Sequence, residues 1–122
     1  MTTTMILIIV ARVLLGGYFL QAGVRNFRRL ELHTGILTRK GVPVPRVSLL
    51  IALAVQVLGG LSVVLGVFPA WGAVGLIGFT ILANATYHNF LQYQGDERMS
   101  HLGSVLTNLG LIGGLLLVIA TA

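Results

Sequence analysis

Cysteine is absent from this chain of 122 residues, and charged residues make up only 9% of it. The missing cysteine excludes disulfides, thiol catalysis, cysteine-ligated iron–sulfur clusters and covalently attached c-type haem. A soluble domain carries about 25% charged residues, whereas this chain is 56% hydrophobic with a mean hydropathy of +0.95. The composition therefore predicts an integral membrane protein, folded as a single domain over residues 1–122.

Four apolar segments each approach the roughly 20 residues that a helix needs to cross the hydrocarbon core of a bilayer. They cover residues 5–24, 47–68, 71–91 and 102–120. Backbone amides in lipid must bond within the protein, so these segments are expected to be helices. The predicted fold class is all-α, a transmembrane four-helix bundle.

Positive charge is confined almost entirely to one side of this bundle. The connection over residues 25–46 holds six basic residues, the third connection holds Arg98, and the opposite side holds none. The positive-inside rule places both of these connections in the cytoplasm and both termini on the extracytoplasmic side. In the first connection, basic and apolar residues alternate, which predicts a short amphipathic helix on the inner membrane surface that ends at Gly41.

Arg25, Arg28 and Arg29 of that connection are expected to contact anionic lipids or a partner protein at the cytoplasmic face. A nucleic acid is a poorer explanation of the basic run, because lipid headgroups are nearer. Arg12 is different, since it lies inside the first apolar segment, and the three acids of the chain, Glu31, Asp96 and Glu97, are all in polar segments.

Arg12 has two groups of possible partners. It could snorkel toward outer headgroups or bond backbone carbonyls freed near glycines. It could instead bond Ser or Thr hydroxyls, an anionic lipid or ligand, or an acid of another subunit. Because Gly16, Phe19 and Gly23 share its helix face by three/four spacing, we expect Arg12 to point into a protein interface.

Polar side chains within the other three segments form the candidate site. Lipid contact is costly for such groups, so Gln56, Asn84, His88 and Asn108 are expected to meet inside the cytoplasmic half of the bundle. The polar face of the fourth segment also includes Ser104 and Thr107. Interhelical hydrogen bonding alone would explain the cluster, at about 1 kcal/mol per bond. The sharper hypothesis is a quinone pocket, in which amides and an imidazole bond the quinone carbonyls.

Other cofactors are disfavoured. His88 and His101 could ligate a b-type haem from neighbouring helices, but nothing else in the sequence marks a haem pocket, and His33 lies in a connection. There is no HExxH motif and no set of carboxylates and histidines suited to a metal. No acid lies in the apolar segments to orient a catalytic triad. We therefore predict no catalytic residues and no metal site.

The first segment and its flank carry a pattern that resembles the DoxX/DoxD-like family of small four-helix membrane proteins. The family's R-x-L-L-G-x-x-F-x-x-A-G segment is matched by Arg12, Leu14, Leu15, Gly16, Phe19, Ala22 and Gly23, and the basic and aromatic residues that follow it by Arg25 and Phe27. The Gly-x-Pro-x-Pro motif is matched by Gly41, Pro43 and Pro45, and the Asn-Leu pair of the fourth helix by Asn108 and Leu109. Gln56, ahead of Gly59 and Gly60, replaces an acid that the family usually carries.

The resemblance implies a link to membrane redox chemistry, because family members occur as subunits of thiosulfate:quinone oxidoreductase and of related complexes. The expected function is an accessory or quinone-interacting subunit of a membrane redox complex. The alternative is a non-catalytic structural or assembly subunit of a larger membrane protein complex. A stand-alone enzyme is the weakest hypothesis, since no residue set here passes electrons without a cofactor. We expect a multi-pass protein of a bacterial or archaeal cytoplasmic membrane.

The predicted topology is open to a direct labelling test. A cysteine at Thr3 should react with an impermeant maleimide on intact cells, whereas a cysteine at Arg39 should react only after the membrane is opened, because the basic connection is cytoplasmic. The chain has no cysteine of its own, so the background is clean. Labelling at position 39 but not at position 3 would invert the orientation.

Overall fold

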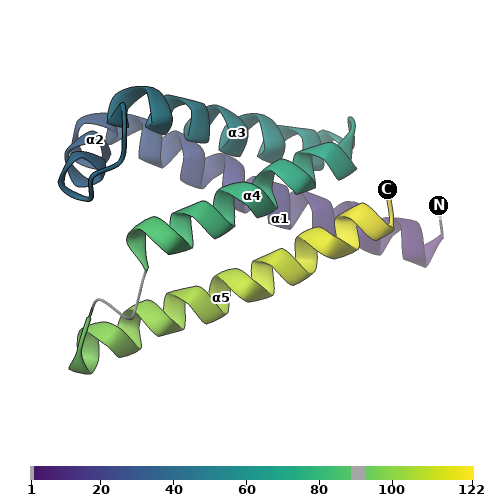
Figure 1. Ribbon diagram of the computed structural model, residues 1–122. Coiled ribbons are helices and arrows are strands. Elements are labelled where there is room, and N and C mark those ends of the chain that lie inside the picture. The colour runs from purple at the N-terminus through teal and green to yellow at the C-terminus, as the bar shows by residue number, and fades with distance from the viewer. Residues whose placement is uncertain (1, 89–92) are drawn as a thin grey trace.

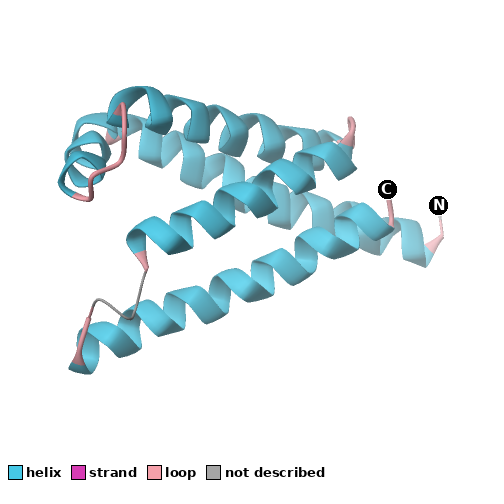
Figure 2. Cartoon of the chain, viewed as in Figure 1, coloured by secondary structure: helices cyan, strands magenta, loops and turns pink. Residues whose placement is uncertain are grey.

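The computed structural model describes residues 2–88 and 93–122, which form helices and connecting turns. The helices are α1 (Thr3–Arg28), α2 (Leu30–Arg39), α3 (Pro45–Leu65), α4 (Pro69–Tyr87) and α5 (Gly95–Ala120). All but α2 are long and apolar enough to cross a membrane. The predicted all-α fold with four spanning helices is confirmed, and α2 is the short helix expected within the basic connection (Figure 2).

The helix boundaries differ from the sequence prediction by several residues. Helix α1 runs on through Arg25 and Arg28, so part of the expected connection is helical. Helix α3 ends before Gly66, whose φ of 72° is the left-handed conformation that ends helices. Pro69 then begins α4, as a proline without an amide hydrogen can at the first position. Helix α5 begins seven residues before the expected residue 102, whereas residues 89–92, at the end of the expected third segment, lie outside the described residues.

The spanning helices form a row in which each packs mainly on its sequence neighbour. Helix α1 packs along α3, α3 along α4 and α4 along α5, whereas α5 touches α1 only slightly. Both termini lie at one end of the molecule, and α2 lies at the other (Figure 1). The shared end for the termini agrees with the sequence prediction, while the side of the membrane that they face remains a prediction.

Two apolar clusters hold the row together. The larger joins α1, α3, α4 and α5 in the half nearer the termini and consists of Phe19, Val63, Ala73, Leu76, Leu115 and Val118. The smaller fixes α2 against the start of α3 through Leu37, Leu49 and Leu53. An exposed ion pair between Arg46 and Glu31, 2.7 Å long, also joins these two helices, but such pairs contribute only about 0–1 kcal/mol.

Glycine brings α1 and α3 into direct backbone contact. A Cβ atom added to Gly16 would lie 2.7 Å from the carbonyl oxygen of Gly60, and one added to Gly60 would lie 2.9 Å from the carbonyl oxygen of Gly16. Neither position therefore has room for a side chain. Small residues allow this approach in membranes, where helix association depends on close packing.

We expect Gly16→Ala to destabilise the fold by about 1–3 kcal/mol, because the added methyl overpacks the crossing. Gly17→Ala is the matched control, since a Cβ atom there meets nothing within 4 Å. Reversible unfolding in mixed micelles measures both. Equal stabilities for the two variants would show that the backbone contact does not hold the helices together.

Candidate ligand-binding pocket

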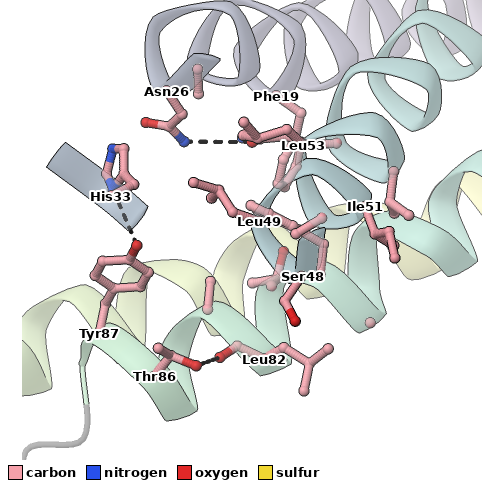
Figure 3. A pocket seen from close by; sticks show the side chains of 18 of the residues that line it. Phe19, Asn26, His33, Ser48, Leu49, Ile51, Leu53, Leu82, Thr86 and Tyr87 are labelled. Carbon is pink, nitrogen blue, oxygen red and sulfur yellow. Dashed lines mark hydrogen bonds between the residues drawn. The ribbon is translucent and has the colours of Figure 1, made fainter. Parts of the chain in front are cut away.

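A cavity of about 690 Å³ lies between the helices in the half of the molecule that contains α2. Its walls come from α1, α2, α3 and α4, and α5 adds Asn108. Apolar side chains make up much of the wall, including Phe19, Ile51, Leu53 and Leu82 (Figure 3). Ligand pockets usually measure about 300–1,000 Å³ and combine apolar walls with few polar groups, so this cavity is large enough for a small organic molecule.

The Asn26–Gln56 pair supplies one polar edge of the cavity. Asn26 on α1 donates from Nδ2 to Oε1 of Gln56 on α3, at a long 3.5 Å. Gly23 makes the contact possible, because a Cβ atom there would lie 2.7 Å from Val57 and 3.4 Å from Gln56. Gln56 is only 3% exposed. Its Nε2 group has no hydrogen-bond partner among the described residues, so an amide donor remains available at the cavity wall.

The His33–Tyr87 pair supplies a second polar edge. His33 Nδ1 of α2 lies 3.1 Å from the hydroxyl of Tyr87, in the last turn of α4. In Figure 3 the Tyr87 hydroxyl points toward His33, while Asn26 reaches toward α3. Burial lowers the pKa of His33 below its ordinary value of 6.5, and the positive charges of Arg29 and Arg25 lower it further. The neutral imidazole is therefore favoured, and its Nδ1 can accept a hydrogen bond from the hydroxyl.

The structure divides the four predicted pocket residues among separate pairs. Asn108 donates from Nδ2 to Oδ1 of Asn84 at 2.6 Å, and Nδ1 of His88 lies 3.1 Å from Nδ1 of His101. Gln56, His88 and Asn108 line the cavity, but Asn84 does not. Gln56 bonds Asn26 of α1 instead, so one amide pair joins α1 to α3 and the other joins α4 to α5.

The polar face predicted for α5 is only partly inside the bundle. Ser104 and Asn108 are half-buried, whereas Thr107 is exposed and donates its hydroxyl to the carbonyl oxygen of Gly103. The expectation that Thr107 meets the other helices is therefore wrong. A hydroxyl that bonds the carbonyl four residues earlier on its own helix needs no partner from another helix.

Sequence reasoning missed Asn26 and His33 as pocket residues. Asn26 follows Ala22 and Gly23 by four and three positions, so it continues the buried face of α1. That signal was present in the sequence, but the expected end of the first helix before Arg25 concealed it. The position of His33 depends on how α2 folds back against α3, which no local pattern specifies.

The predicted contact residues lie at both ends of the molecule. Arg25 lines the cavity. Arg28 and Arg29 end α1 and are exposed. None of these three forms an ion pair or side-chain hydrogen bond with the described residues, which leaves them available to anionic groups. Arg12 lies at the opposite end, against Gly66.

His88 and His101, the pair weighed as haem ligands from the sequence, bond each other. Their Nδ1 atoms are 3.1 Å apart, which is the distance of a direct hydrogen bond. In the described ranges, residues 2–88 and 93–122, no group of three or more His, Cys, Asp or Glu side chains is arranged to hold a metal ion.

Four spanning helices, a short amphipathic helix and a cavity among them define a small multi-pass integral membrane protein. The family model of DoxX matches residues 7–89, and the chain therefore belongs to the DoxX family. The match covers α1 to α4, which supply all of the cavity wall except Asn108. Comparisons with curated proteins and with solved structures found no match.

The lowered pKa of His33 makes the stability of the fold pH-dependent. Because the unfolded chain binds this proton more readily than the folded chain, stability should fall as the pH drops through the ordinary histidine value of about 6.5. His33→Gln keeps a group that can bond Tyr87 but does not titrate. Its unfolding midpoint should lose less between about pH 7.5 and pH 5 than that of the unmodified protein. Equal losses of the unfolding midpoint in the two proteins would contradict a titrating His33. Burial also lowers the pKa of His88, but this effect is common to both proteins and cancels in the comparison.

Proposed function

We propose that this DoxX-family protein is an accessory, quinone-interacting subunit of a membrane redox complex. The observation that carries the proposal is the available amide of Gln56 at the wall of the 690 Å³ cavity. The hydrogen bond of Gln56 to Asn26 uses its Oε1 atom, so the Nε2 group can donate to a ligand with a carbonyl oxygen. A quinone offers such oxygens on a flat ring.

The distribution of polar groups around the cavity fits a neutral head with an apolar tail. Asn26 and Gln56 offer donors on one side, and His33 and Tyr87 form the second polar edge. The walls between them are apolar, as an isoprenoid or alkyl tail requires. No Asp or Glu is among the described lining residues, so nothing there favours a cationic ligand.

The composition supports the role of a subunit over that of a complete enzyme. The chain has no cysteine, and the described residues offer no cluster suited to a metal. A quinone held in the cavity would therefore exchange electrons with a group carried by another protein. The redox connection itself comes from the family resemblance, and the DoxX match supports the family alone.

Replacing Gln56 by Leu should weaken binding of a short-chain benzoquinone about tenfold, which corresponds to one lost hydrogen bond of about 1.4 kcal/mol. Asn84→Leu is the matched control, because it also breaks an interhelical amide pair but lies outside the cavity wall. Titration of the purified protein in nanodiscs measures affinity, and unfolding measures stability. The dimethoxy analogue of the same ring, which lacks the carbonyl oxygens, should bind weakly to every variant.

Two results would contradict the quinone proposal. One is failure of the unmodified protein to bind the benzoquinone more tightly than its dimethoxy analogue. The other is an equal loss of affinity in Gln56→Leu and Asn84→Leu. Either result favours the second function, a non-catalytic structural or assembly subunit, for which the polar pairs serve only to fix the packing.

One observation supports that second function independently. A Cβ atom added to Gly103, Gly110 or Gly113 on α5 would meet nothing within 4 Å. These glycines therefore do not serve packing within the described chain. Small residues on an uncovered helix surface allow another helix to approach closely, as an assembly subunit requires.

A further inference from the structure

The guanidinium group of Arg12 lies against the end of α3 and has no hydrogen-bond partner among the described residues. A Cβ atom on Gly66, the residue that ends α3, would lie 3.0 Å from Nη2 and 3.1 Å from Nη1 of Arg12. The guanidinium therefore rests on the backbone at that helix end. Its Nε atom is buried and has no hydrogen-bond partner, and no ion pair to Arg12 is formed within residues 2–88 and 93–122.

The end of α3 offsets only part of this charge. The negative end of a helix dipole stabilises a cation by about 0.3–1 kcal/mol. Ser62 donates its hydroxyl to the carbonyl oxygens of Val67 and Phe68 in the following turn, and among the described residues no hydrogen bond joins Arg12 to a carbonyl oxygen there. A charge in apolar surroundings is stabilised by a paired counter-charge, and no acidic side chain lies at this helix end.

The level of Arg12 along the membrane normal argues against a lipid phosphate as its partner. From Arg12 back to its start at Thr3, helix α1 extends for roughly 13 Å at 1.5 Å per residue. This arm reaches beyond the α3–α4 turn (Figure 1). Residues Met5–Val10 of this arm are entirely apolar. This apolar arm belongs in hydrocarbon, so the phosphate plane lies beyond Arg12, on the side of Thr3.

The acidic side chains of a second copy of this chain do not reach Arg12 either. Glu31 is on α2, while Asp96 and Glu97 are in the first turn of α5. All three lie at the end of the molecule opposite Arg12, and copies inserted in the same orientation would keep these side chains there. An Asp or Glu side chain at the level of Arg12 would therefore have to belong to a different protein.

We propose that Arg12 and the first turns of α1 dock a transmembrane helix of another membrane protein, one that carries an Asp or Glu at the level of Arg12. No residue of α1 before Gly16 is buried, so this arm has free surface for a helix. The paired carboxylate would satisfy the guanidinium and its buried Nε donor. The inference does not depend on whether the cavity binds a quinone.

A model helix tests this proposal without knowledge of the natural partner. The probe is a synthetic Leu/Ala peptide of about 20 residues with one Glu placed to match Arg12, and its control carries Gln there. Energy transfer between the labelled peptide and the labelled full chain is measured in phosphatidylcholine vesicles at about pH 8, so that the carboxyl group can ionise. The Glu peptide should bind at least about tenfold more tightly than the Gln peptide.

The variants link this preference to Arg12. Arg12→Leu should abolish the difference between the two peptides, and Arg12→Glu should instead prefer a peptide with Lys at the same position. Circular dichroism and the unfolding midpoint establish that each variant is folded. Equal binding of Glu and Gln peptides to the unmodified protein would overturn the proposal, even if every variant failed to fold.

Two further outcomes would also overturn it. If phosphatidylglycerol in the vesicles removes the preference for Glu at constant ionic strength, a lipid headgroup occupies the site. If the chain associates with itself in a way that requires Arg12, a second copy occupies it. Binding of benzoquinone is read separately and is unaffected by each of these results.

Discussion

The backbone contact between Gly16 and Gly60 sets the register of α1 on α3, and much of the chemistry of the molecule depends on that register. Because α1 and α3 are antiparallel, moving toward the C-terminus of α1 corresponds to moving toward the N-terminus of α3. Two turns past the crossing, Gly23 therefore meets Gln56, and Asn26 reaches the same side chain. One turn before the crossing, Arg12 meets Gly66. If α1 shifted along α3, both the Gly23–Gln56 contact and the Arg12–Gly66 contact would be lost.

The apolar surroundings explain why polar groups here occur in pairs or bond their own backbone. Asn26 pairs with Gln56 and Asn84 with Asn108, each across two helices. Buried Thr80 donates to the carbonyl oxygen of Leu76 on its own helix. A polar group that found no such partner would be expensive in lipid. Among the buried side-chain nitrogen and oxygen atoms of the described residues, the Arg12 Nε atom is the one without a hydrogen-bond partner.

Much of this architecture could be predicted from the sequence, because the signals involved are local. Length and hydropathy identified the four spanning helices, and the three/four spacing placed Arg12, Gly16, Phe19 and Gly23 on one face, of which the last three are buried. The partners across helices could not be predicted in the same way. Gln56 was expected beside Asn84 and Asn108, but it bonds Asn26 of α1, whereas Asn84 and Asn108 bond each other. Which helix stands beside which is a property of the whole fold, and no spacing within one segment encodes it.

The Gln56 amide and the Arg12 guanidinium lie at opposite ends of the molecule, which separates their chemistry. The Gln56 amide is neutral and borders a cavity, so a neutral carbonyl ligand satisfies it without a change in net charge. The Arg12 guanidinium is half-buried with an unpartnered Nε atom, and an anionic group can bond it. A small ligand at one end and a neighbouring helix at the other can thus be bound together, since neither occupies the surface that the other needs. That separation is compatible with the proposed role as an accessory subunit.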